Sequence, residues 1–451
     1  MKQLNNIERF YFIGIGGIGM SALARYFYAS KKLVSGYDKT ASTLTNKLQE
    51  EGILIQFEDD VSKIPSEYKT KSNTLIVYTP AIPKENKILN WFQNNNFSIV
   101  KRAELLGMIT QETMCLAVAG THGKTTTSAI LGHLLAGCNE PVTAFLGGIS
   151  ENYNSNIIIN GSEITVVEAD EFDRSFLQLR PNIACVTSMD ADHLDIYNDE
   201  AAIKKAFNDF AALLPEDGIL IHKNGLPLNG KTVGINDDSD FAATDIRIED
   251  GSYVFNLKTP KETIKNLKFH LPGHHNLLNA VTALGMAISL GSPTDCLSKA
   301  LVNFKGVKRR FSYKIRNKNC VLIDDYAHHP SEINAVYQAV TELYPGKKVL
   351  VVFQPHLFSR TRDFANEFAK SLSQFEHVFL LDIYPAREKP IEGISSEWLL
   401  DKVNSKNKRL VSKINLGEAI KNTGCEIILL LGAGDIGEEV DTITKILSCE
   451  N

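Results

Sequence analysis

The sequence has no apolar run as long as a membrane span, and no long basic run of the kind that binds nucleic acid. Its seven cysteines are dispersed and include no CxxC pair, which argues against a zinc knuckle and predicts reduced thiols. No repeat of fixed period and no low-complexity tract interrupts the chain. These absences, with the small net charge of −5, predict a cytoplasmic protein whose partners are neither nucleic acids nor membranes.

What is present is enough material for several domains, because 451 residues with 43% hydrophobic content suggest about three. Apolar runs of strand length alternate with helix-compatible stretches, which predicts an α/β fold. We expect a Rossmann-like domain over residues 1–110, a P-loop domain over 111–311 and a Rossmann-like C-terminal α/β domain over 312–451. An uncharged stretch at 10–24 could also be a signal peptide, but its glycines fit a strand-to-helix turn better.

The expected strands follow from the apolar runs. Those of the first domain are 11–15, 33–37 and 75–79; those of the second are the run before residue 120, then 164–167, 183–187 and 218–221, with shorter strands over 237–271. Those of the third are 321–323, 349–353, 378–381 and 427–431, with helices after Pro330 and Thr361. Open α/β sheets bind ligands at the carboxyl ends of their strands, so the polar residues there are the candidates for a site.

The most informative stretch is 114–127, MCLAVAGTHGKTTT, where an apolar strand turns into a helix. It predicts a nucleotide phosphate loop made of Gly120, Thr121, His122, Gly123, Lys124, Thr125 and Thr126. Amide groups at a helix start attract phosphate, while Lys124 can reach the terminal phosphates and Thr125 can offer its hydroxyl to Mg²⁺. Two residues separate the glycines where the common pattern has four. The alternative is an ordinary glycine turn before a helix.

Two acidic clusters follow strands of the same domain. The first contains Glu168, Asp170, Glu171 and Asp173, and the second contains Asp190, Asp192, His193 and Asp195. Carboxylate oxygens suit Mg²⁺, which one or two protein groups hold together with phosphates and water. The alternative is that these acids are solvated loop charges or helix caps, an interpretation that we accept for Asp173 and Asp195.

The first domain contains a second glycine motif, formed by Gly14, Gly16, Gly17 and Gly19, with Asp38 after the next strand. Such a turn accommodates a diphosphate, and the carboxylate accepts a hydrogen bond from a ribose hydroxyl. The motif suits NAD and a nucleotide-sugar diphosphate equally, and it could also be a turn that only packs a strand on a helix.

Further polar residues follow in the rest of the chain. Asn276 and Asn279 lie on one face of an expected helix, where an amide pair could bind an adenine edge or Asn276 could cap the helix. Arg310 could contact a transferring phosphoryl group or form a surface ion pair. Polar groups then follow two strands of the third domain: Asp325, Tyr326 and His328 after the first, and Arg360 after the second. From spacing alone, His328 could equally be structural.

The motifs FIGIGGIGMS, AGTHGKTTT, EADEFD, DADHLD, GHHNLLNA, GVKRRF, DDYAHHP, FQPH with SRTRD, and GAGDIG occur in one order that resembles the Mur ligase family, from about residue 10 to about 440. The histidines in GTHGKT and DDYAHHP favour the family members that act on L-alanine. The resemblance implies ATP-dependent ligation of L-alanine to the lactyl carboxylate of UDP-N-acetylmuramate through an acyl phosphate. It also implies a monomer or homodimer that binds UDP-sugar, ATP and amino acid on its first, second and third domains.

The resemblance assigns roles to individual residues. Thr125, Glu168 and His193 match the metal ligands, and Lys124 matches the phosphate-binding lysine. Asn276, Arg310 and Asp325 match contacts to adenine, phosphate and ribose of ATP, in an order that is left open. Gly16, Gly17, Gly19, Asp38, Thr79 and Ala81 match the UDP-sugar site, and Tyr326, His328 and Arg360 match the amino-acid side. Lys124, Glu168, His193 and Arg310 form the expected catalytic set.

Two departures from the family pattern affect the amino-acid side and the metal region. Leu357 stands where many relatives have arginine, and Phe172 and Arg174 lie within EADEFDRS. Three alternatives stay open: a murein peptide ligase that attaches a preformed tripeptide, a nicotinamide-dependent oxidoreductase, and a binding protein without catalysis. Because the sites lie on three domains, we also expect the chain to bend near Thr110 and near Phe311.

Overall fold

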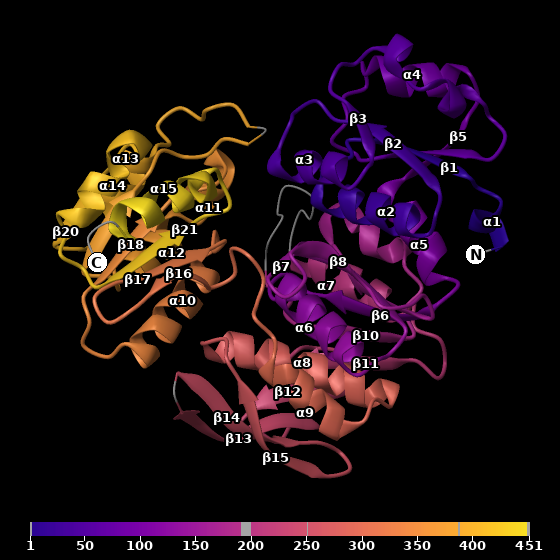
Figure 1. Ribbon diagram of the computed structural model, residues 1–451. Coiled ribbons are helices and arrows are strands. Elements are labelled where there is room, and N and C mark those ends of the chain that lie inside the picture. The colour runs from indigo at the N-terminus through magenta and orange to yellow at the C-terminus, as the bar shows by residue number, and fades with distance from the viewer. Residues whose placement is uncertain (1, 191–199, 250, 387, 449–451) are drawn as a thin grey trace. The chain divides into compact units, whose positions relative to one another are not determined.

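The computed structural model describes residues 2–190, 200–249, 251–386 and 388–448, and its chain folds into two compact units (Figure 1). Unit 1 comprises residues 1–247, 254–269 and 278–305, and unit 2 comprises 248–253, 270–277 and 306–451. None of the helices within the described ranges combines the length and apolarity that a bilayer crossing demands.

The first sheet of unit 1 is parallel and has the order β3-β2-β1-β4-β5. Its strands are β1 (Arg9–Ile13), β2 (Leu33–Tyr37), β3 (Leu54–Gln56), β4 (Thr74–Tyr78) and β5 (Ser98–Lys101). Side chains of β1 alternate between the two faces, since Phe10 and Phe12 join one apolar cluster and Tyr11 and Ile13 join another. Burial on both faces explains why this strand reads as a continuous apolar run.

The second sheet of unit 1 has ten strands in the order β15-β14-β13-β12-β11-β10-β6-β9-β7-β8. Its strands are β6 (Met114–Ala119), β7 (Val142–Ser150), β8 (Ser155–Ile159), β9 (Ile164–Glu168), β10 (Ile183–Val186), β11 (Ile219–Lys223), β12 (Lys231–Ile235), β13 (Phe241–Glu249), β14 (Ser252–Lys258) and β15 (Thr263–Phe269). The strand β6 that precedes the phosphate loop lies between β9 and β10, so the loops after these three strands share one edge.

Helices cover both sheets of unit 1. They are α1 (Lys2–Asn5), α2 (Ile18–Ala29), α3 (Thr43–Glu50), α4 (Lys87–Asn94), α5 (Arg102–Thr110), α6 (Lys124–Gly137), α7 (Glu200–Ala211), α8 (His274–Leu290) and α9 (Thr294–Val302), with the 3₁₀ turns η1 (Val61–Lys63), η2 (Ser66–Lys69) and η3 (Phe172–Gln178). Helix α2 packs on β1 and β2 and also on β7 and β8, so it lies between the two sheets (Figure 1).

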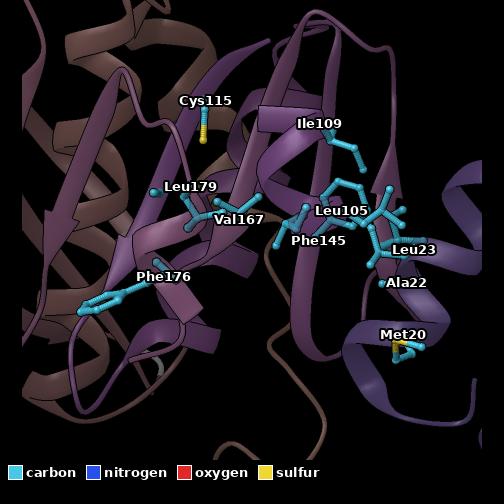
Figure 2. Packing of buried hydrophobic residues seen from close by; sticks show 14 of the residues in the cluster. Met20, Ala22, Leu23, Leu105, Ile109, Cys115, Phe145, Val167, Phe176 and Leu179 are labelled. Atoms are coloured by element: carbon cyan, nitrogen blue, oxygen red, sulfur yellow. The ribbon is translucent and has the colours of Figure 1, made fainter. Parts of the chain in front are cut away.

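One apolar cluster runs through both halves of unit 1. Met20 and Leu23 of α2 and Leu105 of α5 belong to the same cluster as Phe145 of β7 and Phe176 of η3 (Figure 2). The backbone N–H of Arg180 donates to the buried Thr110 hydroxyl at 3.3 Å, which joins the segments further. Thr110 is therefore packed against a continuous core, and the expected bend near it stays a prediction.

Unit 2 contains a six-stranded sheet in the order β16-β17-β21-β18-β19-β20, in which β16 is antiparallel to β17. Its strands are β16 (Ser312–Arg316), β17 (Val321–Asp325), β18 (Val349–Phe353), β19 (His377–Leu380), β20 (Asn407–Leu410) and β21 (Ile427–Leu431). Its helices are α10 (Pro330–Leu343), α11 (Phe358–Asp363), α12 (Ala365–Leu372), α13 (Ser396–Lys402), α14 (Lys413–Lys421) and α15 (Ile436–Ser448). Separate apolar clusters line the two faces of the sheet, as expected for a doubly covered sheet.

The fold class predicted from the sequence is confirmed, since all three expected sheets form and each expected strand lies within one or two residues of an observed one. The expectation for the cysteines is wrong at one pair. A disulfide joins Cys138 at the end of α6 to Cys296 in α9, with their Cα atoms 5.5 Å apart. These residues are 158 positions apart, and nothing in their spacing indicated that α6 and α9 pack together. Cys449 lies outside the described residues.

Candidate active site

The predicted phosphate loop is a tight turn between β6 and α6. Gly120 and Gly123 have φ angles of +130° and +85°, a region that side chains other than glycine rarely adopt. A Cβ atom at Gly120 would also collide with the Thr187 hydroxyl. The first α6 bond runs from the Thr127 N–H to the Gly123 carbonyl, so the amides of residues 123–126 precede it at the helix start. This is the arrangement of amides that attracts phosphate.

Two residues that the sequence reasoning missed brace this loop. Thr187 and Ser188 directly follow β10. The Ser188 hydroxyl accepts a bond from the His122 N–H at 2.8 Å and lies 2.9 Å from the Thr121 hydroxyl. The Thr187 hydroxyl lies within hydrogen-bond distance of the carbonyls of Ala119 and His122, and its single proton can be donated to either. Their signal was their place at the end of a strand beside β6, where the polar residues of open sheets gather.

Lys124 is the first residue of α6 and points back over the loop. Its Nζ donates to the Gly120 carbonyl at 2.6 Å and to both carboxylate oxygens of Glu171, at 2.9 and 2.8 Å. Burial alone would lower the pKa of Lys124, but the carboxylates of Glu171, Asp170 and Glu168 outweigh it and raise that pKa above its ordinary value. The lysine is therefore a permanent cation at the mouth of the loop.

Glu168, the last residue of β9, lies beside the loop because β9 pairs with β6 in register Val118 to Glu168. Its Oε2 accepts a bond from the Gly147 N–H at 3.1 Å, which orients the carboxylate. Thr125 follows Lys124 and is buried, while His193 lies outside the described residues. Within the described ranges no three His, Cys, Asp or Glu side chains form a metal cluster, but Mg²⁺ in nucleotide sites needs fewer protein ligands than that.

The first-domain glycine turn is closed by the acid predicted to bind ribose. Asp38 accepts bonds from the Gly16 N–H at 2.8 Å and from the Thr40 N–H at 3.1 Å. Thr79 follows β4 and lies against Gly14, where a Cβ atom would meet its methyl group. Ala81 lies in the turn that an Ile82 N–H to Thr79 carbonyl bond closes. The carboxylate thus stabilises the turn itself, and its contact with a ribose stays a prediction.

One cavity of about 270 Å³ lies between the glycine turn and the β9 end. Among its lining residues are Gly17, Gly19, Thr79, Arg102, Glu168 and Asp170. Arg102 at the start of α5 approaches Gly19 and forms a 3.9 Å ion pair with Asp170. Unit 1 therefore brings three of the six predicted UDP-sugar residues and one predicted metal ligand together around one space.

The predicted residues of unit 2 gather where β17 ends. Asp325 accepts bonds from the Phe311 N–H at 2.6 Å and from the Ala327 N–H at 2.7 Å. Burial raises the pKa of this carboxyl to about 6. Arg310 lies over the Tyr326 ring, with its guanidinium carbon 5.0 Å from the ring centre. Asp325 therefore anchors the segment that carries Arg310, a role that the sequence did not indicate.

His328 lies in the same group through Glu332, which the sequence reasoning missed. Glu332 accepts bonds from the backbone N–H groups of His328 at 2.8 Å and His329 at 3.1 Å, and its other oxygen is 3.9 Å from Arg310. A glutamate at the third position of the helix that Pro330 begins was the signal, since it is typical of a capping box. Arg360 lies on α11 after β18, at the sheet edge where β17 also ends.

The Asn276 amide has one hydrogen-bond partner within its own segment. It is buried, and its Nδ2 donates to the Pro272 carbonyl at 2.7 Å. Asn279, one turn later, lies against Gly123 of the phosphate loop. The contact of Asn276 with adenine stays a prediction.

The neighbouring His275 should make the protein sensitive to acid. Burial lowers its pKa from 6.5 to about 4, so the folded chain keeps it neutral while the unfolded chain takes up a proton as the pH falls below 6.5. Stability is then lost between pH 6.5 and 4, by up to about 3 kcal/mol. We expect the thermal midpoint of His275→Gln to fall by fewer degrees than that of the parent when the pH is lowered from 7.5 to 4.5. Equal losses would contradict this assignment, and pH 7.5 serves as the reference at which both proteins carry a neutral side chain.

Comparisons with known proteins agree with this arrangement. The Mur ligase family catalytic domain matches residues 9–113, the Mur ligase middle domain matches 118–287, and the Mur ligase glutamate ligase domain matches 309–434. A UDP-N-acetylmuramate–L-alanine ligase of Christiangramia forsetii is 65% identical over 99% of both chains. The crystal structure of a UDP-N-acetylmuramate–alanine ligase from Thermotoga maritima has a TM-score of 0.83 and 27% identity, covering 98% of this chain and 100% of that one.

A murein peptide ligase from Psychrobacter arcticus shares the fold with a TM-score of 0.68 and 19% identity, covering 98% of both chains. The three Mur ligase models together cover most of the chain. They give no support to the alternative of a nicotinamide-dependent oxidoreductase. With its phosphate loop, its glycine turn and these full-length relatives, the chain belongs to the Mur ligase family.

Proposed function

We propose that this chain joins L-alanine to the lactyl carboxylate of UDP-N-acetylmuramate at the expense of ATP. The observation that carries the proposal is the cavity lined by both the glycine turn and Glu168. A sugar nucleotide bound at the glycine turn would place its carboxylate in this cavity. ATP bound at the phosphate loop would direct its terminal phosphate toward the same place. The name of the 65% identical relative supports the same pair of substrates.

The chemistry explains why the two sites must adjoin. A carboxylate is a poor electrophile, because its leaving group would be oxide. Attack of a carboxylate oxygen on the γ-phosphorus releases ADP and gives an acyl phosphate, whose carbonyl carbon the amine of L-alanine then attacks as inorganic phosphate leaves. Lys124 and the amides at the start of α6 would stabilise the charge on the transferring phosphoryl group.

Glu168 and Thr125 fit a Mg²⁺ ion, because they supply a carboxylate and a hydroxyl beside the loop. The bond from the Gly147 N–H fixes the Glu168 carboxylate, as outer contacts of metal ligands do. When bound, Mg²⁺ would neutralise phosphate charge. His193 remains the proposed second ligand.

The remaining residues are proposed for the two other substrates. Asp325, Arg310 and Asn276 would complete the ATP site, and Tyr326, His328 and Arg360 would bind L-alanine. In this proposal residues 1–110 hold the UDP-sugar, 111–311 hold ATP and 312–451 hold the amino acid. We further propose that the enzyme acts in the cytoplasm, as a monomer or homodimer.

The test compares two amine substrates. The protein is incubated with UDP-N-acetylmuramate, ATP and Mg²⁺, together with L-alanine or a tripeptide, and inorganic phosphate is measured. We expect release with L-alanine and little or none with the tripeptide. Release with the tripeptide only would make the chain a murein peptide ligase, and omission of the UDP-sugar provides the blank.

A further inference from the structure

The lysine of the phosphate loop already has a full set of partners inside the protein. Its Nζ contacts the carbonyls of Gly120 at 2.6 Å and Thr121 at 3.4 Å, and both carboxylate oxygens of Glu171. An ammonium group has three N–H donors, and these four acceptor atoms already compete for them. A terminal phosphate can therefore gain Lys124 only if one of the present partners gives it up.

Glu171 is the partner that conflicts with phosphate. Its side chain is 2% exposed and that of Lys124 is 13% exposed, so little water screens the pair. A backbone carbonyl is neutral overall, whereas the Glu171 carboxylate carries the same sign of charge as a phosphate. A phosphate oxygen within hydrogen-bond distance of Nζ would lie only a few ångströms from that carboxylate, and the two would repel each other.

The two acids at the end of β9 and just after it have different partners. Glu168 accepts from the Gly147 N–H, while Glu171 directs both of its oxygens at Lys124. Glu171 is therefore engaged with a cation of the protein, and a metal ion would have to compete with that cation for it. This separates Glu171 from Glu168, although both belong to one acidic cluster of the sequence.

We propose that Glu171 is a positioning residue, a counter-ion that holds Lys124 over the phosphate loop and releases it when a nucleoside triphosphate binds. The inference rests on the proposed function, since it requires that the loop binds ATP. It makes the ion pair a competitor of the nucleotide, so weakening the pair should strengthen binding.

The first test measures the affinity of the full chain for a non-hydrolysable ATP analogue by calorimetry, without Mg²⁺. Glu171→Gln keeps the size of the side chain and removes its charge, and we expect its Kd to be roughly tenfold lower than that of the parent. Glu171→Asp keeps the charge and should bind like the parent. A merely structural role would weaken binding on substitution, so an unchanged or higher Kd for Glu171→Gln would overturn the proposal. So would a loss of affinity seen only with Mg²⁺, which would make Glu171 a metal ligand.

The second test asks whether the pair is coupled, and it needs no activity. Loss of Lys124 leaves a buried carboxylate without this cation, so Lys124→Ala should lower the thermal midpoint. Adding Glu171→Gln should recover part of that loss, which gives a positive coupling in the double-mutant cycle. The exposed pair Lys205 and Asp209, 2.8 Å apart on α7, provides the control cycle with little coupling. Additive shifts at Lys124 and Glu171 would overturn the proposal.

The results separate this inference from the function on which it rests. If the parent releases phosphate with L-alanine while Glu171→Gln binds the analogue no more tightly, the ligase stands and the counter-ion role is wrong. If Glu171→Gln gains affinity and shows coupling while no amine substrate supports turnover, the counter-ion role stands and the substrates are wrong.

Discussion

Lys124→Ala is expected to reduce phosphate release with UDP-N-acetylmuramate, ATP and L-alanine by about a thousandfold or more. The substitution removes the one loop cation that lies over the Gly120 carbonyl, beside the amides at the start of α6. These groups stabilise the negative charge of the transferring phosphoryl group. Removal of the lysine should therefore lower kcat more than it weakens binding. A single-turnover assay with radiolabelled ATP would measure the chemical step directly.

Folding must be checked before this loss is assigned to catalysis, since the variant also removes the cation that Glu171 contacts. The double variant Lys124→Ala with Glu171→Gln should be better folded and still inactive. Lys205→Ala, which removes a lysine 74% exposed on α7, should keep the parental rate. If phosphate release survives Lys124→Ala, the loop has been assigned to the wrong function.

Glu168→Gln is expected to lower the rate on the order of a hundredfold at millimolar Mg²⁺ and to raise the Mg²⁺ concentration for half-maximal activity. Glutamine can still accept the bond from the Gly147 N–H, so the side chain should keep its place while losing its charge. This experiment distinguishes a metal ligand from a structural acid. Excess Mg²⁺ should restore part of the activity of Glu168→Gln only if Glu168 binds the ion.

The matched control for this experiment is Glu163→Gln, an exposed glutamate just before the same strand β9. It removes the same charge at the opposite end of that strand, away from the phosphate loop, and should leave the Mg²⁺ dependence unaltered. Identical Mg²⁺ titrations for Glu168→Gln and the parent would remove Glu168 from the proposed metal site.

Much of the fold could be predicted because buried parallel strands are short apolar runs bounded by polar residues. The turn between β6 and α6 was equally visible, since glycines marked the change from strand to helix, and Gly120 and Gly123 adopt positive φ angles there. Strands β7 and β8 were not predicted, although β7 is apolar over most of its length, because no functional motif marked the turn between them.

The contacts that complete the site could not be predicted in the same way. Thr187 and Ser188 brace the loop from a strand about 65 residues further on, and Glu171 reaches Lys124 from 47 residues away. These contacts between distant residues depend on which strands become neighbours in a sheet. The hydrophobic periodicity of a sequence carries no information on the order of strands in the sheet. Asp38 and Asp325 show the same limit, because their backbone partners are set by tertiary packing.

The core that joins α2 and α5 to β7 and η3 limits how this protein can be recombined. A chimera that replaces residues 1–110 with the equivalent part of an enzyme for a different sugar nucleotide would expose Phe145 and Phe176 to mismatched surfaces. Deleting or misfitting a few such side chains costs several kcal/mol, which is a large part of a typical unfolding free energy. A successful exchange would therefore have to include the residues of β7 and η3 that pack against α2 and α5, so residues 1–110 cannot be exchanged alone without a loss of stability.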